Sequence, residues 1–268
     1  MINNIDYHII DKCNLNCANC NHFSPLVPSS DNGKSIEQIT ADLALLSKIK
    51  DGFETLSILG GEPTLHPQLS KILKIARDFL PNNTIHLVTN GTLYNDFGRW
   101  KAALAENKID VFISLYPYCE NSVERTLKIN ETLKPEVNVF VEQTAIGTGF
   151  SYGFLSNRDN VATENDISMC NRPYLCSQLK NGKLYICNFA AQFDRLKNYF
   201  GDKITFDLDG NEYFDLNEEI TLDDLNSFIN FARPSICYHC TDCIEQHGMG
   251  RIKPWGTTKK DINEWIAE

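Results

Sequence analysis

The sequence predicts an α/β protein, most of a parallel β/α barrel followed by a smaller cysteine-rich region. Three observations lead to this prediction. Short apolar, β-branched runs alternate with helical patterns through the first half of the chain. Motifs rich in glycine or cysteine follow several of these runs directly. Beyond about residue 150 the alternation stops, and six of the ten cysteines lie there.

Five short runs have the composition of buried parallel strands. The last four begin 26 to 30 residues apart, which leaves room for a helix in each connection. We therefore expect parallel βαβ units, and five or six such units make a barrel or most of one. The runs are YHII (7–10), TLSIL (55–59), IHLV (85–88), VFISL (111–115) and VNVFV (137–141).

Helical patterns fill the intervals between these runs. Ser35 and Gln38 form a capping-box pattern, which predicts a helix start. The apolar residues that follow recur at helical spacing, so they fall on one face. A second helix is expected to begin at Pro67 and to end at the PNN segment (81–83).

The unusual motifs are all expected at one rim of the barrel. In parallel barrels the functional side chains collect at the carboxyl ends of the strands. Four motifs occupy such positions after consecutive strands: the cysteines of DKCNLNCANC (11–20), GGEP (60–63), TNG (89–91) and SLYP (114–117). This convergence makes the rim the expected active site.

Composition limits the function. The chain has 268 residues and no apolar run of 18 or more, and its N-terminus lacks the basic region and cleavage site of a signal peptide. We therefore expect a cytoplasmic protein that does not span a membrane. The net charge of −10 argues against broad contact with nucleic-acid phosphates or anionic lipid. Because the cytoplasm keeps thiols reduced, ten cysteines indicate metal or cluster ligation rather than disulfides.

The first cysteine group has the spacing C-x3-C-x2-C, formed by Cys13, Cys17 and Cys20. A structural zinc site normally has four protein ligands, so three thiolates leave one coordination position open. The spacing alone suits zinc or an iron–sulfur cluster equally well. GGEP changes this balance. Its two glycines allow close backbone approach to a ligand, and Glu62 offers a carboxylate to an amino group at the same rim.

C-x3-C-x2-C after the first strand, with GGEP after the second, resembles the radical S-adenosylmethionine (AdoMet) enzymes over about residues 5–145. The resemblance implies a partial (β/α)6 TIM-like barrel. It also implies a [4Fe–4S] cluster whose open iron binds AdoMet, and cleavage of AdoMet to a 5′-deoxyadenosyl radical that abstracts hydrogen from a substrate. A reducing partner such as flavodoxin or ferredoxin follows from the same resemblance.

The resemblance assigns roles to particular residues. Asn90 and Ser114 match positions near the ribose or carboxylate of AdoMet, although TNG is equally a plain turn. Asn19 departs from the family, which often has an aromatic residue just before the third cysteine, and this weakens the expected adenine contact there. The implied cluster ligands are Cys13, Cys17 and Cys20, and the implied methionyl-amine site is Gly60, Gly61 and Glu62.

The C-terminal cysteines resemble the auxiliary-cluster domain of the SPASM and Twitch subfamilies. The resemblance lies in Cys170-x11-Gly182-x4-Cys187, followed by Cys237-x2-Cys240. It implies one auxiliary [4Fe–4S] cluster, while zinc suits such C-x2-C pairs as well. We expect a barrel core over residues 1–150, extending to about residue 165 at most, and an auxiliary domain over 166–268. The implied ligands are Cys187, Cys237 and Cys240, with the fourth from Cys170, Cys176 or Cys243.

Two further residues are candidates for the catalytic site. Cys119 lies beyond the fourth strand, where a thiol could return a hydrogen atom to a substrate radical; we expect it instead to be a small, partly buried residue at the start of a helix. Arg158 could orient a carboxylate or hydroxyl of the substrate, or could be a surface residue.

These features favour an enzyme that oxidises a small molecule: a sugar, a cyclitol or a nucleotide-linked sugar. One alternative is epimerisation of a sugar, with Cys119 as hydrogen donor. Another is modification of a ribosomally made peptide, which would need a partner to recognise the peptide. A non-catalytic zinc-binding module is the third alternative, and it leaves GGEP unexplained.

Overall fold

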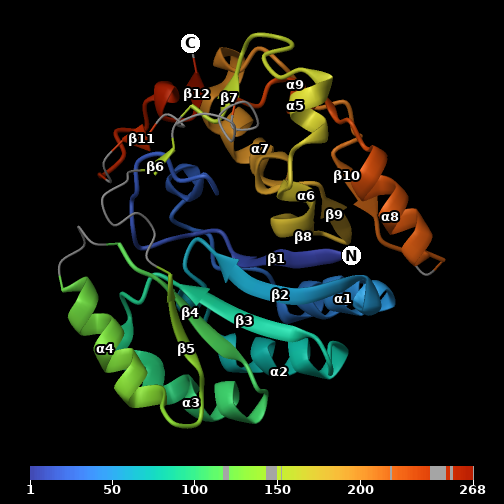
Figure 1. The fold of residues 1–268 in the computed structure, drawn as a ribbon. Coiled ribbons are helices and arrows are strands. Elements are labelled where there is room, and N and C mark those ends of the chain that lie inside the picture. Colours follow the sequence, from blue (N-terminus) through green and yellow to red (C-terminus); the bar gives the residue numbers. More distant parts are fainter. Residues whose placement is uncertain are drawn as a thin grey trace.

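The computed structural model describes residues 1–116, 121–142, 150–151, 153–217, 219–241, 252–253 and 256–267. Cys119 and Cys243 lie outside the described residues. The main sheet has eight strands in the order β10-β9-β8-β1-β2-β3-β4-β5 (Figure 1). Because β10 and β5 lie at opposite edges of this order, the described sheet is a partial barrel.

The five expected strands are all present, and neighbours pair in parallel. A sixth parallel strand, β8 (Ser177–Lys180), adds to the free edge of β1, with Ile5 opposite Ser177. The antiparallel strands β9 (Lys183–Tyr185) and β10 (Tyr213–Asp215) extend that edge. The five expected strands are β1 (Ile2–Ile10), β2 (Phe53–Gly60), β3 (Thr84–Thr89), β4 (Asp110–Ser114) and β5 (Val139–Glu142).

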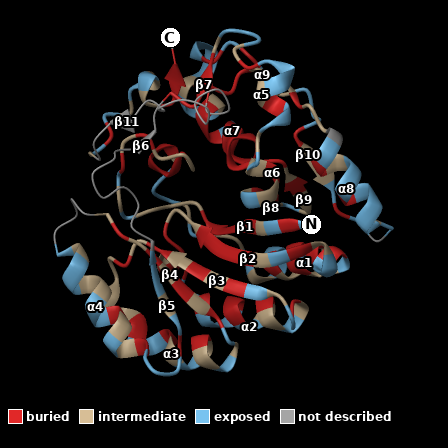
Figure 2. Ribbon diagram, in the orientation of Figure 1, coloured by how far each residue is buried: buried red, intermediate tan, exposed pale blue. Residues whose placement is uncertain are grey.

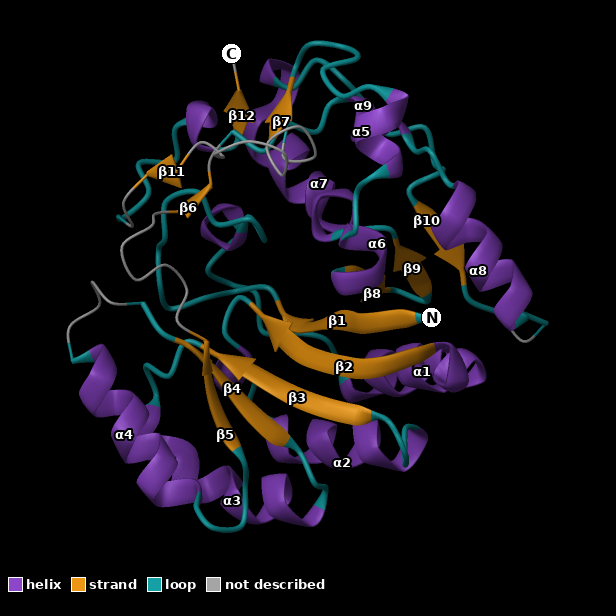
Figure 3. Ribbon diagram, viewed as in Figure 1, coloured by secondary structure: helices purple, strands orange, loops and turns teal. Residues whose placement is uncertain are grey.

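Four helices cover the outer face of β1–β5 (Figures 1 and 3). The helix α1 begins at the predicted capping box, where Gln38 N donates to Ser35 Oγ at 3.2 Å and Ser35 N donates to Gln38 Oε1 at 2.8 Å. The helix α2 begins at Leu69, two residues after the predicted start at Pro67, and Gln68 is its N-cap residue. The helices are α1 (Ile36–Leu46), α2 (Leu69–Phe79), α3 (Phe97–Glu106) and α4 (Ser122–Leu133).

Exposure in the sheet increases toward the β5 edge (Figure 2). Outward-facing residues of the strands join the helices in one large apolar core; Tyr7 also donates to Asp42 Oδ2 of α1 at 2.9 Å. On the inner face, Phe112 is half-buried and Phe140 of β5 is 45% exposed. The inner face is therefore most open at the β5 edge.

A second apolar core lies mainly in the C-terminal half, where it includes Phe154, Phe189 and Trp265; Phe23 and Leu26 from the N-terminal half also belong to it. Its strands β8–β10 nevertheless continue the sheet of the barrel, so the two halves share one sheet. The domain division expected between residues 150 and 165 stays a prediction. The remaining elements are β6 (Phe150–Ser151), β7 (Leu155–Ser156), α5 (Glu164–Ser168), α6 (Arg172–Leu175), α7 (Asn188–Phe200), α8 (Leu222–Phe231), α9 (Ser235–Tyr238), β11 (Ile252–Lys253) and β12 (Ile266–Ala267).

A search of the described residues for a helix with the length and apolar character needed to cross a lipid bilayer finds none.

Candidate active site

The residues predicted at the rim line one cavity. The cysteine loop, defined as residues 13–20, follows β1 and supplies three of them, with Cys17 buried and the other two cysteines half-buried. The ends of β2, β3 and β4 supply the rest, so the convergence expected from the strand order is present in space. The predicted residues that line this cavity are Cys13, Cys17, Cys20, Gly60, Gly61, Glu62, Asn90 and Ser114.

Gly60 and Gly61 bring the end of β2 against the end of β1. A Cβ atom on Gly60 would lie 1.9 Å from the carbonyl oxygen of Ile10, and one on Gly61 would lie 2.3 Å from the carbonyl oxygen of Lys12. Gly61 N donates to Ile10 O at 2.9 Å, and Glu62 N donates to Lys12 O at 2.9 Å. The glycines thus permit close backbone packing, which fixes Glu62 relative to the start of the cysteine loop.

The carboxylate of Glu62 is fully buried and held by donors from two loops. Its Oε1 accepts hydrogen bonds from Thr89 Oγ1 at 2.7 Å, from Thr64 N at 3.1 Å and from the Thr64 hydroxyl. Its Oε2 accepts one from Asn90 N at 2.8 Å. Burial raises the pKa of Glu62, although these donors act in the opposite direction. Neither Thr64 nor Thr89 was identified as a site residue from the sequence, although Thr89 is the first residue of the TNG motif that was placed at the rim.

The thiol of Cys13 lies close to this carboxylate. Burial is the main cause that raises the pKa of Cys13 to about 12, and the nearby Glu62, Cys20 and Cys17 raise it further. A hydrogen bond from Leu15 N, at 3.4 Å, acts in the opposite direction. Asn90 Nδ2 also approaches Cys13 Sγ, at 3.7 Å. A buried thiol of this kind becomes a thiolate when a bound metal replaces its proton.

The donor set of this cavity fits a cluster that carries one thiolate on each of several irons. Among the described residues, the lining of this cavity includes the three thiols of the cysteine loop, a set that leaves one position of such a cluster open for another ligand. The buried Ser24 Oγ also faces this cavity and has no hydrogen-bond partner among the described residues.

Tyr116 is a further residue of this cavity, and the prediction missed it although it belongs to the quoted SLYP motif. It follows Ser114, which ends β4. Burial raises the pKa of Tyr116 well above its usual value, so its hydroxyl is neutral.

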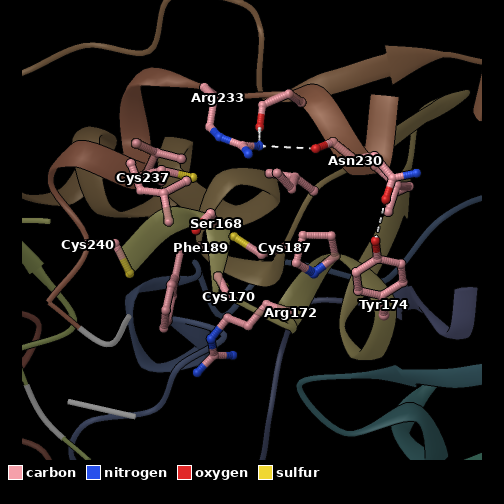
Figure 4. Close-up of a pocket in the computed structure, with 16 residues that line it drawn as sticks. Ser168, Cys170, Arg172, Tyr174, Cys187, Phe189, Asn230, Arg233, Cys237 and Cys240 are labelled. Atoms are coloured by element: carbon pink, nitrogen blue, oxygen red, sulfur yellow. Dashed lines mark hydrogen bonds between the residues drawn. The ribbon is translucent and has the colours of Figure 1, made fainter. Parts of the chain in front are cut away.

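Four of the C-terminal cysteines line a second cavity (Figure 4). Arg172, Arg233 and Phe189 lie beside them, and the Tyr174 hydroxyl donates to Asn230 Oδ1 at 2.6 Å at one end. Burial raises the pKa of Cys187 to about 12 and also raises that of Cys237. The four cysteines are Cys170, Cys187, Cys237 and Cys240.

Two predicted residues lie apart from both cavities. Cys176 follows α6 and is not among the residues that line the second cavity. Arg158 is exposed beyond β7, where its backbone N donates to Ser156 Oγ at 3.0 Å. The structure therefore gives neither residue a place in the two cysteine-lined cavities.

Comparisons with known proteins bear on these two cavities. The Radical SAM superfamily model matches residues 7–131. A GTP 3′,8-cyclase from Campylobacter jejuni is 30% identical over 102 residues, which are 37% of this chain and 30% of the relative. An S-adenosylmethionine-dependent nucleotide dehydratase from Flammeovirga pacifica is 31% identical over 99 residues, 36% of this chain and 33% of the relative. The chain thus spans about a third of the length of these curated relatives.

Among solved structures, the crystal structure of BtrN in complex with AdoMet and 2-DOIA has a TM-score of 0.55 and 14% sequence identity. The match covers 90% of this chain and 93% of that chain. The likeness shows a shared fold across both halves of the molecule. The match to the Radical SAM superfamily model thus covers residues 7–131, where the first cavity lies, and the likeness to BtrN concerns the fold.

Proposed function

We propose that this protein is a radical SAM enzyme that oxidises a small molecule, a sugar, a cyclitol or a nucleotide-linked sugar. The observation that carries the proposal is the meeting of Cys13, Cys17 and Cys20 with the buried carboxylate of Glu62 in one cavity. Reductive cleavage of AdoMet to a 5′-deoxyadenosyl radical is the chemistry that a [4Fe–4S] cluster supplies when it is bound at such a site. A reduced flavodoxin or ferredoxin would deliver the electron.

In this proposal the three cysteines hold the cluster and the neighbouring strand ends orient AdoMet. Glu62 lines the cavity, and its Oε2 accepts one hydrogen bond from the described residues, so this oxygen can accept a second one from the methionyl ammonium. Asn90 and Ser114 offer polar groups to the ribose or carboxylate. Apolar residues at the same strand ends, Leu59 and Val88, exclude water from the same space.

We further propose an auxiliary [4Fe–4S] cluster held by Cys170, Cys187, Cys237 and Cys240. Their shared cavity supports this choice over a set containing Cys176. Arg172 Nη1 donates to Asn188 Oδ1 at 3.2 Å, and the guanidinium carbon lies 4.8 Å from the centre of the Phe189 ring. This fixes a positive charge beside the four thiols, which favours their thiolate forms. Zinc at these cysteines is the competing assignment.

The four-cysteine cavity favours oxidation over epimerisation. A substrate radical that loses a proton from its hydroxyl must give up one electron to become a carbonyl compound, and an auxiliary cluster can accept that electron. Epimerisation instead requires a hydrogen donor, for which the candidate, Cys119, lies outside the described residues. The names of the curated relatives, a GTP cyclase and a nucleotide dehydratase, favour a nucleotide-linked sugar among the three substrate classes.

The test is turnover in deuterated water with AdoMet, a reductant and a panel of UDP-, GDP- and dTDP-linked hexoses. Oxidation predicts one 5′-deoxyadenosine for each carbonyl product and no solvent deuterium on the product carbon. Solvent deuterium on that carbon, lost in a Cys119→Ala variant, would instead establish epimerisation. If 5′-deoxyadenosine formation stays at the substrate-free rate with every hexose, the nucleotide-linked class is excluded.

A further inference from the structure

The last described segment of the chain, residues 256–267, runs along the cysteine loop. Ala18 N donates to Gly256 O at 2.7 Å, and Thr258 N donates to Asn16 O at 2.9 Å. Between these bonds Cys17 and Thr257 form an antiparallel β-bridge. Figure 1 shows the red C-terminal part of the chain beside the blue segment that follows β1. The backbone of the cysteine loop is thus paired with a segment some 240 residues away in the sequence.

Trp265 holds the carboxyl end of the cysteine loop. Its side chain is fully buried, and its Nε1 donates to Cys20 O at 2.9 Å. The indole ring packs edge-on against Phe23, with ring centres 6.4 Å apart, and lies 5.9 Å from the ring of Phe200 on α7. Cys20 O also accepts Phe23 N at 3.0 Å, so this carbonyl is fixed from two directions.

Glu264 contacts the residue that precedes Cys20. Its Oε2 accepts Asn19 N at 3.4 Å and also the hydroxyl of Thr258. Asn19 adopts the left-handed backbone conformation, with φ of 59°, and it is buried. An asparagine tolerates this conformation at modest cost, and the contact with Glu264 helps to hold it.

The same segment is anchored in the C-terminal half. The strand β12 pairs in parallel with β7, where Leu155 N donates to Trp265 O at 3.1 Å. Leu155 in turn forms a β-bridge with Cys240 of the second cavity. The segment is therefore tied to the core that contains the second cysteine group, and it contacts the first.

We propose that residues 256–267 form a strap that positions the cysteine loop for its cluster, with Trp265 as the main positioning residue. The inference rests on the proposed function, because it concerns the loop proposed to hold that cluster. The amide of Ala18 and the carbonyls of Asn16 and Cys20 bond to the strap, so the spacing of the three thiols depends on contacts from the far end of the chain.

The experiment compares Trp265→Phe with Trp100→Phe in the full-length, anaerobically reconstituted protein. Both tryptophans are buried, but Trp100 lies on α3 against Phe97, in the core that the helices form with the outer face of the sheet. The readouts are the rate of iron release to a chelator, the EPR spectrum of the reduced protein with and without AdoMet, and the thermal unfolding of each variant. Loss of one hydrogen bond predicts about 2–10-fold faster iron release for Trp265→Phe, with an altered AdoMet-dependent EPR signal. Trp100→Phe should match the wild type in both.

Separate outcomes overturn the two proposals. If the wild type holds no iron that depends on Cys13, Cys17 and Cys20, the proposed function fails and the strap inference with it. If the wild type holds this cysteine-dependent iron, but a folded Trp265→Phe variant has the same iron-release rate and EPR spectrum as the wild type, only the strap inference is wrong. Should Trp265→Phe not fold, Glu264→Gln, which keeps the side-chain volume and removes the charge, must show faster release; an unchanged rate contradicts the inference.

Discussion

Glu62 Oε2 accepts the backbone N–H of Asn90 at 2.8 Å, which ties the loop after β2 to the loop after β3. The other carboxylate oxygen is fixed by the side chain of Thr89 at the end of β3, at 2.7 Å. A buried carboxylate with this many donors has one orientation before any ligand arrives. The side chain is therefore preorganised to meet a positively charged group in the cavity lined by the first cysteines, as the proposed AdoMet site requires.

Replacing Glu62 with Gln is expected to weaken AdoMet binding and leave the iron content unchanged. The substitution exchanges a charge-assisted hydrogen bond to the methionyl ammonium for a neutral one, a loss of about 1–3 kcal/mol or about 5–150-fold in Kd. Anaerobic titration of the reconstituted protein with AdoMet measures the change.

Glu54→Gln is the matched control, because Glu54 is exposed on the same strand, β2. It should leave the Kd for AdoMet at the wild-type value. An unchanged Kd in Glu62→Gln would mean that Glu62 does not contact the ligand.

The second cavity predicts different outcomes for two cysteines that are close in sequence. If the proposed auxiliary cluster is present, Cys170→Ala removes one of its four ligands and should reduce the iron of the reconstituted protein from about eight to about four per chain. Cys176→Ala should leave the iron content unchanged, because Cys176 does not line that cavity. Iron and zinc analysis of both variants tests the assignment.

Two results would contradict it. Equal iron loss in both variants would place Cys176 in the ligand set. Zinc without iron at the C-terminal cysteines of the wild type would show that the auxiliary site is not an iron–sulfur cluster.

The stability of the metal-free protein is expected to fall as the pH falls from 6.5 toward 4. His8 is buried, with Nε2 2.9 Å from His22 Nδ1 and Nδ1 3.3 Å from Asp11 Oδ1. Burial lowers the pKa of His8 to about 4; the neighbouring Asp11 opposes this change, while Arg195 and Lys180 support it. Between pH 6.5 and 4 the unfolded chain therefore binds more protons at this residue than the folded chain does.

One such group costs about 1.4 kcal/mol per pH unit within that window, on the order of 2–3 kcal/mol in total. Urea unfolding at pH 7 and pH 5 measures the difference in the free energy of unfolding. A His8→Gln variant should show a smaller pH dependence than the wild type. Equal pH dependence in the two proteins would rule out His8 as a source of the effect.

The barrel strands and the convergence of their motifs could be predicted because both depend on local pattern. Buried parallel strands have continuous β-branched runs, and their carboxyl ends meet at one edge, so Cys13 and Glu62 could be brought together from the sequence alone. The capping box of Ser35 is equally local. The close approach of Gly60 to the backbone of Ile10 is a contact between two strand ends, which the GGEP motif alone does not indicate.

Long-range pairings could not be predicted in this way. The strand β8 has four residues and adds to the free edge of β1, a choice that depends on the packing of the whole C-terminal half. The hydrogen bond from Trp265 to Cys20 joins residues 245 positions apart, and no periodicity marks it. The sequence spacing suits either Cys170 or Cys176 as a ligand. Which of the two lines the second cavity depends on how α6 is placed, and the sequence pattern does not show this.

The most direct test of the account is AdoMet cleavage by anaerobically reconstituted wild type and a Cys13→Ala, Cys17→Ala, Cys20→Ala triple variant. The wild type should bind about eight irons and, once reduced, convert AdoMet to methionine and 5′-deoxyadenosine. The triple variant should bind about half the iron and form no 5′-deoxyadenosine. Cleavage retained by the triple variant, or zinc in place of iron at these three cysteines in the wild type, would contradict the account.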